Sequence, residues 1–364
     1  MISAKNTLRI NLGIIAQNYI NLRNVCNNVE VGASIKANCY GLGMDCIAPV
    51  LEKSGCRNFF VATCDEGVEL RKIIAKQSNI YVLQGVFADD IELFHLHNLI
   101  PVLNHLKQVN IWYKFAIKLD KKLPCIIHVD TGMHRLGMSS QELMQCRLIK
   151  KQSYLNIDYI MSHLACAEEG QNSYNQMQLE KFNNLVEPFA GIKKSFANSG
   201  GIFLGSDYHF DLVRPGAAIY GINLNCNISS QLLQNPVELL VPIIQLHELL
   251  PGESVGYNNT YTNNSKESCL IATIPIGYAD GLPRSLSNKG FVYIAGIKVP
   301  IIGRISMDLT IINVSLISRE HLFLGQIVEI MGKNNNPDDL AQLSDTNSYE
   351  ILTRIGTRFN KIYI

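Results

Sequence analysis

A lysine follows a short apolar run near the start of the chain. Lys36 comes after Val-Gly-Ala-Ser-Ile at residues 31–35 and is followed by Ala-Asn-Cys-Tyr-Gly. If this run is a buried strand, its last side chain lies at the strand end, where loss of water and nearby cations would lower the pKa of the amine and make it a better nucleophile. Many such lysines only extend along apolar surface to reach water, so Lys36 needs partners to indicate chemistry.

Polar residues also end other apolar runs. Asp130 ends the run at 125–130 and Arg135 lies shortly after it, while His163 ends the run at 157–163. Two small-residue turns, at 198–201 and 214–216, follow the runs at 194–197 and 210–213. Glycine-rich turns commonly hold phosphate, because their backbone N–H groups can approach it closely. A reactive lysine opposite a phosphate-binding turn is the arrangement that a pyridoxal phosphate cofactor requires.

The elements that would position these residues alternate between strand and helix. Segments of helical period, such as 46–53 and 176–189, lie between eight candidate strands, at 31–36, 58–63, 79–83, 100–103, 125–130, 157–163, 194–197 and 210–213. This alternation predicts a (β/α)8 TIM barrel over residues 1–235. In such barrels the active site lies at the carboxyl ends of the strands.

The pattern changes after Asn235 and Pro236. Alternating, β-branched runs separated by Gly, Asn and Pro occur at 237–250, 269–276, 291–303, 310–314 and 327–331. They predict a mostly antiparallel C-terminal β domain over residues 236–364.

Composition excludes several classes of protein. The 364 residues carry a net charge of +1 and no large basic cluster, so we expect no nucleic-acid partner. The N-terminus lacks the apolar core of a signal peptide, and no apolar run reaches the roughly 20 residues of a membrane span, so we expect a cytoplasmic protein without membrane contact. The ten cysteines are scattered without Cys-x-x-Cys spacing and predict neither disulfides nor a metal site.

The chain resembles the alanine racemase family over essentially its whole length. Eight segments match in family order and span both predicted domains: 33–43, 60–67, 129–137, 161–165, 197–199, 213–221, 274–281 and 303–308. The resemblance implies a pyridoxal 5'-phosphate-dependent isomerase that interconverts L-alanine and D-alanine and supplies D-alanine for peptidoglycan. It also implies a homodimer with active sites at the interface.

Two of the matching positions imply the catalytic bases. Lys36 resembles the lysine that binds the cofactor and acts on one face of the substrate, and Tyr257 resembles the tyrosine on the opposite face. Racemisation needs two groups, because a single base returns the proton to the side it came from.

Further positions match binding roles in the family. Arg214 resembles the partner of the pyridine nitrogen, and His163 with Arg214 resembles a cationic network that assists the tyrosine. Other matches imply contacts to the phosphate and cofactor, or to the substrate carboxylate and the cofactor's phenolic oxygen; the first set is Tyr40, Asn198, Ser199, Gly216 and Ala217, and the second is Arg135 and Met307.

Two positions depart from the family pattern. His128 stands where many members have a lysine modified to a carbamate, an anion that orients the arginine matching Arg135. Thr357 stands where the family usually has a tyrosine that touches the phosphate and narrows the entrance.

Three alternatives stay open from the sequence. A broad-specificity racemase for serine or larger amino acids would share the site, and Thr357 is the feature that allows it. Fold-related decarboxylases place a carboxylate at the pyridine nitrogen, which Arg214 argues against. Non-enzymatic pyridoxal-phosphate-binding proteins resemble the barrel alone, so residues 236–364 argue for an enzyme.

Overall fold

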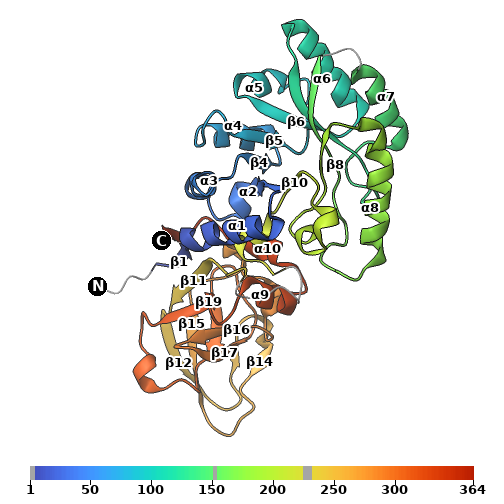
Figure 1. Ribbon diagram of the computed structural model, residues 1–364. Coiled ribbons are helices and arrows are strands. Elements are labelled where there is room, and N and C mark those ends of the chain that lie inside the picture. Colours follow the sequence, from blue (N-terminus) through green and yellow to red (C-terminus); the bar gives the residue numbers. More distant parts are fainter. Residues whose placement is uncertain (1–4, 151–153, 224–231) are drawn as a thin grey trace. The chain divides into compact units, whose positions relative to one another are not determined.

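The computed structural model describes residues 5–150, 154–223 and 232–364 (Figure 1). These residues form two compact units, and each is considered separately below. One unit runs from Ile15 to Gln234, and the other combines the residues up to Ile14 with Asn235–Ile364.

The first unit contains a closed parallel barrel. Its strands are β2 (Glu30–Val31), β3 (Ala33–Ser34), β4 (Asn58–Val61), β5 (Asn79–Val82), β6 (Leu99–Leu103), β7 (Leu123–His128), β8 (Leu155–Met161), β9 (Lys193–Ser195) and β10 (Leu212–Val213). They are ordered β2-β10-β9-β8-β7-β6-β5-β4-β3. Only Gly32 separates β2 from β3, so these two segments count as one strand and the barrel has eight strands. All neighbours are parallel, and the ring closes where Leu212 pairs with Glu30 and Ala33 with Phe59. The predicted (β/α)8 barrel is confirmed.

Helices lie on the outside of the strands (Figure 1). They are α1 (Leu12–Cys26), α3 (Met44–Lys53), α4 (Cys64–Arg71), α5 (Ile91–Leu96), α6 (Leu106–Leu119), α7 (Ser140–Lys150) and α8 (Ser173–Val186), while α2 (Lys36–Tyr40) is a short turn after β3. The predicted helical segments at 46–53 and 176–189 correspond to α3 and to α8 with the 3-10 turn η1 (Glu187–Phe189).

Large side chains fill the barrel interior. One buried cluster joins residues from β4 to β8 and β10: Phe60, Tyr81, Ile100, Val102, Ile126, Tyr159, Met161 and Leu212. A barrel packed in this way is a solid core, so its polar chemistry is confined to the strand ends.

The second unit is built on a mostly antiparallel nine-stranded sheet. Its order is β12-β15-β18-β17-β16-β19-β11-β1-β20. The strands are β1 (Thr7–Ile10), β11 (Val237–Pro242), β12 (Gln245–Leu249), β15 (Cys269–Ile274), β16 (Phe291–Ile294), β17 (Ile297–Ile302), β18 (Thr310–Asn313), β19 (Ile327–Met331) and β20 (Asn360–Tyr363). The hairpin β13 (Ser254–Val255) and β14 (Tyr261–Thr262) and the helices α9 (Pro337–Ser344) and α10 (Ser348–Thr353) complete the unit.

The N-terminal strand differs from the expected division at residue 235. β1 pairs antiparallel with β11 and parallel with β20, so residues up to Ile14 belong to the second unit rather than to the barrel. Four residues are too few to show a period in the sequence, and their partners are more than 200 positions away. No helix in the described part of the chain is long and apolar enough to cross a bilayer.

Candidate active site

Lys36 begins a left-handed turn directly after β3. Residues 37–40 all have φ between 52° and 55°, although none of them is glycine. Each non-glycine residue in this conformation costs about 1–2 kcal/mol, and such strain is typical of functional sites. Glu66 holds the turn, because its carboxylate accepts hydrogen bonds from the backbone N–H of Ala37 and of Ala62, both 2.7 Å long. The side chain of Asn38 accepts a further bond from the N–H of Met44 at 2.7 Å.

The amine of Lys36 is half-buried and electrostatically destabilised as an ammonium ion. Burial lowers its pKa, the positive charge of Arg135 lowers it further, and Glu66 partly opposes this. The amine is therefore neutral more often than that of a surface lysine, as a nucleophile or base must be.

Arg214 lies at the end of β10 and is only 5% exposed. Its Nη1 donates to Ser195 Oγ at 2.5 Å, and its Nη2 donates to the carbonyl of Ser162 at 2.6 Å and of Phe196 at 3.4 Å. Burial lowers the pKa of Arg214 to about 9, so the guanidinium remains charged at neutral pH. These bonds fix the orientation of the guanidinium.

His163 contacts the same arginine. Its Nδ1 lies 3.4 Å from Nη2 of Arg214. Since a guanidinium can only donate, Nδ1 is the acceptor. Burial and the charge of Arg214 hold the pKa of His163 well below its usual range. The positive charge of this pair therefore resides on Arg214.

The two small-residue turns meet around the hydroxyl of Ser199. Ser199 Oγ accepts hydrogen bonds from the N–H of Gly216 at 2.8 Å and of Ala218 at 3.2 Å. The N–H groups of Gly216 and Ala217, which the resemblance assigns to the phosphate, therefore belong to the turn that packs against Ser199. A Cβ at position 216 would overlap the hydroxyl of Tyr40. We call this arrangement of Ser199, residues 216–218 and the Tyr40 hydroxyl the cradle. It is suited to binding a phosphate because it combines N–H groups, hydroxyls and a close approach of the backbone.

Tyr40 and Asn198 have different parts in this cradle. Burial raises the pKa of Tyr40 to about 12, so its hydroxyl keeps its proton. The ring of Tyr40 packs against that of Tyr220, with centroids 4.7 Å apart. Asn198 Oδ1 accepts from the N–H of Gly201 at 2.9 Å, so in this structure Asn198 shapes the turn.

The side chain of Arg135 is exposed, and hydrogen bonds fix the loop that carries it. The carboxylate of Asp130 accepts from the N–H of Gly132 at 2.9 Å and of His134 at 3.1 Å. The N–H of Met138 donates to the carbonyl of His128 at 2.8 Å, which closes the loop. The charge of Arg135 acts on Lys36, so the structure brings these two predicted residues to the same end of the barrel.

The remaining predicted residues belong to the second unit. Tyr257 is 69% exposed and Met307 is 54% exposed, which is unusual for large apolar groups. The carbonyl of Met307 accepts from the N–H of Ala279 at 3.0 Å. Thr357 is also exposed and lies beside Arg358, whose guanidinium bonds to Asp280 and Asp308 at 2.7 Å each. Within this unit, the bond between Arg358 and Asp308 therefore connects the loop of Thr357 to the loop of Met307.

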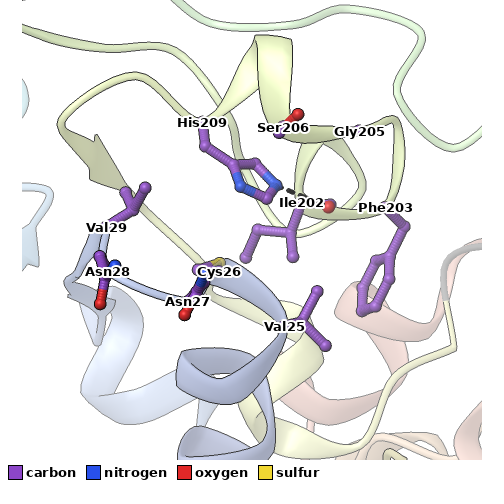
Figure 2. A pocket seen from close by; sticks show the side chains of 10 residues that line it. All are labelled: Val25, Cys26, Asn27, Asn28, Val29, Ile202, Phe203, Gly205, Ser206 and His209. Atoms are coloured by element: carbon purple, nitrogen blue, oxygen red, sulfur yellow. Dashed lines mark hydrogen bonds between the residues drawn. The ribbon is translucent and has the colours of Figure 1, made fainter.

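A hollow of about 630 Å³ has a lining that does not include Lys36 (Figure 2). It is lined by residues 25–29, just before the first barrel strand, and by the 3-10 turns η2 (Gly201–Phe203) and η3 (Ser206–Tyr208) with His209. The imidazole of His209 is already bonded to the carbonyl of Ile202 at 2.8 Å. The lining contains no Asp, Glu, Lys or Arg.

Glu66 is a site residue that we did not predict. Its sequence signal, Thr63-x-x-Glu66, is that of a helix cap, and Thr63 Oγ1 does accept from the N–H of Glu66 at 3.2 Å. The Glu66 carboxylate also accepts a hydrogen bond from the N–H of Ala37, which stabilises the turn at residues 37–40. This second contact joins α4 to α2, and a helix-cap pattern does not indicate it.

Together these features place an amine with a lowered pKa, a buried arginine and a turn that offers backbone N–H groups at the carboxyl ends of the barrel strands. The chain belongs to the alanine racemase family. Residues 10–224 match the family model described as "Alanine racemase, N-terminal domain" and residues 237–363 match "Alanine racemase, C-terminal domain". Because racemases are isomerases, the protein is an isomerase.

Individual proteins agree with this assignment. The alanine racemase of Rickettsia canadensis (strain McKiel) is 49% identical over 361 residues, which covers 98% of each chain. A crystal structure of alanine racemase from Bartonella henselae with covalently bound pyridoxal phosphate has a TM-score of 0.94 and 39% identity, and covers 99% of this chain and all of that one. The alanine racemase structure from Acinetobacter baumannii has a TM-score of 0.89 and 28% identity, with coverage of 99% and 100%.

Proposed function

We propose that the protein interconverts L-alanine and D-alanine with pyridoxal phosphate bound to Lys36. The observation that carries the proposal is the set of groups at one end of the barrel: an amine with a lowered pKa, a buried guanidinium and a cradle around Ser199. The Bartonella henselae racemase contains pyridoxal phosphate covalently bound. When bound, this cofactor supplies an electron sink that stabilises the charge left at the α-carbon after loss of a proton.

Each group at the barrel end would hold one part of the cofactor. Ser199, Tyr40 and the N–H groups of Gly216 and Ala217 or Ala218 would bind the phosphate. Nε of Arg214 would donate to the pyridine nitrogen, and a permanent positive charge there disfavours protonation of that nitrogen. This limits side reactions, because a less electron-poor ring shortens the life of the carbanion.

Two bases would move the proton. Lys36 would take or return it on one face of the substrate, and the hydroxyl of Tyr257 would do so on the other face, with Arg135 and the N–H of Met307 holding the substrate carboxylate or the cofactor's phenolic oxygen. Two groups on opposite faces can invert a centre, whereas one cannot.

We further propose that the active protein is a homodimer in which Tyr257 and Met307 of one chain act with Lys36 of the other. Both side chains are largely exposed, as interface residues would be in an isolated chain. The product, D-alanine, would serve peptidoglycan synthesis from the cytoplasm.

A broad-specificity racemase is the second candidate. Thr357 is exposed and small where the family usually has a tyrosine, so a substrate larger than alanine would meet less obstruction.

The proposal is tested by adding pyridoxal phosphate to the purified protein, recording the visible spectrum, and following L-alanine and L-serine by circular dichroism. We expect the absorption band of lysine-bound cofactor and decay of the L-alanine signal to zero. A protein that binds no cofactor, or that leaves the L-alanine signal unchanged, refutes the proposal. Faster decay with L-serine favours the second candidate.

A further inference from the structure

The turn that follows Lys36 is strained. Residues 37–40 have φ between 52° and 55°, which brings the Cβ of an L-residue close to the following carbonyl oxygen. Four such residues in a row persist only where surrounding contacts fix them. The contacts that fix this turn therefore also fix the chain directly after Lys36.

Glu66 supplies the contact nearest to Lys36. Its Oε1 accepts a hydrogen bond at 2.7 Å from the backbone N–H of Ala37, the residue directly after Lys36. Its Oε2 accepts from the N–H of Ala62 at 2.7 Å. Ala62 directly follows β4, and β4 pairs with β3, the strand that leads to Lys36. One carboxylate therefore joins the ends of two neighbouring barrel strands through charge-assisted bonds, which are stronger than neutral ones.

These bonds go beyond the capping of helix α4. In a capping box, the glutamate at the third helical position accepts from the N–H of the cap residue itself. The cap residue here is Thr63, and its hydroxyl accepts from the N–H of Glu66 at 3.2 Å. The two carboxylate oxygens of Glu66 bond to Ala62 and Ala37. The side chain therefore connects α4 to the turn after Lys36.

The other end of the turn is held by different residues. Tyr40 is 6% exposed, and its ring packs against that of Tyr220 with centroids 4.7 Å apart. The hydroxyl of Tyr40 belongs to the cradle, where Gly216 allows its close approach. The turn thus connects the Lys36 amine to the cradle, and Glu66 acts at the end that carries the amine.

The charge of Glu66 and its hydrogen bond would affect Lys36 in opposite directions. Burial and Arg135 lower the pKa of Lys36, whereas the carboxylate of Glu66 raises it. Loss of the Glu66 charge alone would lower this pKa further, leave more of the amine unprotonated and speed its attack on an aldehyde. Loss of the bond to Ala37 would instead move the amine and slow the attack.

We propose that Glu66 is a positioning residue that fixes the Lys36 amine relative to the cradle by binding the N–H of Ala37. The inference rests on the proposed racemase function and adds to it the residue that places the reacting amine.

Glu66→Gln tests the proposal, because glutamine has the same shape but a single oxygen. It can accept from one of the two N–H groups, while its NH2 group faces the other. We expect protein freed of cofactor to form the absorption band of lysine-bound cofactor at least about tenfold more slowly than wild type after addition of pyridoxal phosphate. We also expect kcat for alanine to fall about 10- to 100-fold with a smaller change in KM, since a displacement of about 1 Å can have this effect.

Pyridoxine phosphate reports on the cradle alone. It has an alcohol in place of the aldehyde and cannot bond to the lysine, so its affinity for Glu66→Gln should stay close to the wild-type value. Asp65→Asn is the matched control, because it removes the same charge from the adjacent, exposed position in the first turn of α4. It should leave the rate of band formation, kcat and the pyridoxine phosphate affinity unchanged.

Three outcomes overturn the proposal. Band formation in Glu66→Gln at the wild-type rate or faster would show that only the charge acts. An equal slowing in Asp65→Asn would show that the effect is not specific to the bond. A matching loss of pyridoxine phosphate affinity in Glu66→Gln would show that Glu66 supports the cradle instead. A wild-type protein that forms no band is a failure of the proposed function, so the two failures are distinguishable.

The bond itself is tested in the wild-type protein without cofactor by hydrogen exchange resolved to single residues. Ala37 is exposed, yet its amide should exchange much more slowly than the same amide in an unfolded peptide, because it is bonded to Glu66. The protection should be lost in Glu66→Gln and kept in Asp65→Asn. An unprotected Ala37 amide in the wild type overturns the proposal without any variant.

Discussion

Lys36 and Arg214 are both basic residues at the same end of the barrel, but they differ in how far their surroundings stabilise the charged form. The pKa of Lys36 falls through burial and the repulsion of Arg135, so its amine loses a proton more readily than that of a surface lysine. Arg214 is buried more deeply, but oxygens of Ser195, Ser162 and Phe196 accept hydrogen bonds from its guanidinium and keep it charged and oriented. A buried charge is tolerated when its donors are paired in this way.

Replacing Tyr257 with Phe should slow proton transfer on one face of the substrate and leave cofactor binding intact, because only the hydroxyl is removed. Deuterium incorporation from solvent, measured in each direction from L-alanine and D-alanine, should become strongly asymmetric. The visible spectrum serves as the control for cofactor binding. Equal incorporation in both directions would argue against a two-base mechanism.

Replacing Thr357 with Tyr should narrow the entrance and lower the ratio of kcat/KM for serine to that for alanine. A size-selecting contact of this kind is worth on the order of 1–3 kcal/mol, or about 10- to 200-fold. Steady-state kinetics with both amino acids measure the ratio. An unchanged ratio would show that Thr357 does not select the substrate by size.

At the scale of elements, the barrel strands could be predicted because each is a short apolar run between helical segments. All eight predicted runs overlap observed strands, and polar residues do follow their carboxyl ends. The left-handed turn at residues 37–40 could not be predicted, because of its four residues only Asn38 is of a type that often adopts positive φ. The conformation also depends on Glu66, about 30 residues away. Strand β1 was not predicted for a similar reason, since its pairing partners are distant in sequence.

The same limit applies to the site. Periodicity and turn residues predicted that Lys36, His163, Ser199 and Arg214 lie at the strand ends. Their roles could be assigned only from the resemblance to the family. The exact donors around Ser199 depend on how the turn at residues 216–218 closes, which short-range pattern does not determine.

Gly216 allows the turn proposed to bind the phosphate to pack against the turn that follows Lys36. In Gly216→Ala, the added Cβ would overlap the hydroxyl of Tyr40 and crowd Ser34, whose Cβ would lie 3.2 Å away. Overpacking of this size costs about 1–3 kcal/mol, so we expect affinity for pyridoxal phosphate to fall about tenfold or more. An absorbance titration with the cofactor measures this.

Gly13→Ala is the matched control, because it adds the same methyl group to α1, where the nearest atom, Asn11 Oδ1, lies 3.2 Å away. It should leave cofactor affinity unchanged. Equal affinities for Gly216→Ala and the wild type would show that the turn does not form the phosphate site.

For the molecule as a whole, the proposed bases lie on different compact units of the chain. Lys36 belongs to the barrel, and Tyr257 belongs to the unit that β1 and residues 235–364 build. The homodimer proposal assigns the two bases of each site to different chains.

Mixing Lys36→Ala protein with Tyr257→Phe protein should therefore restore activity that neither variant has alone. In a mixed dimer one site carries both defects and the other carries neither. With random exchange of equal amounts, about half of the dimers are mixed and about a quarter of all sites are intact, so about a quarter of wild-type activity is expected after co-refolding. Activity no higher than the sum of the two parents would place both bases in one chain.

The most direct test of the account is to locate the cofactor's bond. We would reduce the complex of protein and pyridoxal phosphate with borohydride, digest it, and map the modified lysine by mass spectrometry, with Lys36→Ala treated in parallel. The account predicts a stable cofactor adduct on Lys36, with no adduct at a defined site and no racemisation of alanine in the variant. An adduct on another lysine, or racemisation by Lys36→Ala at the wild-type rate, would contradict it.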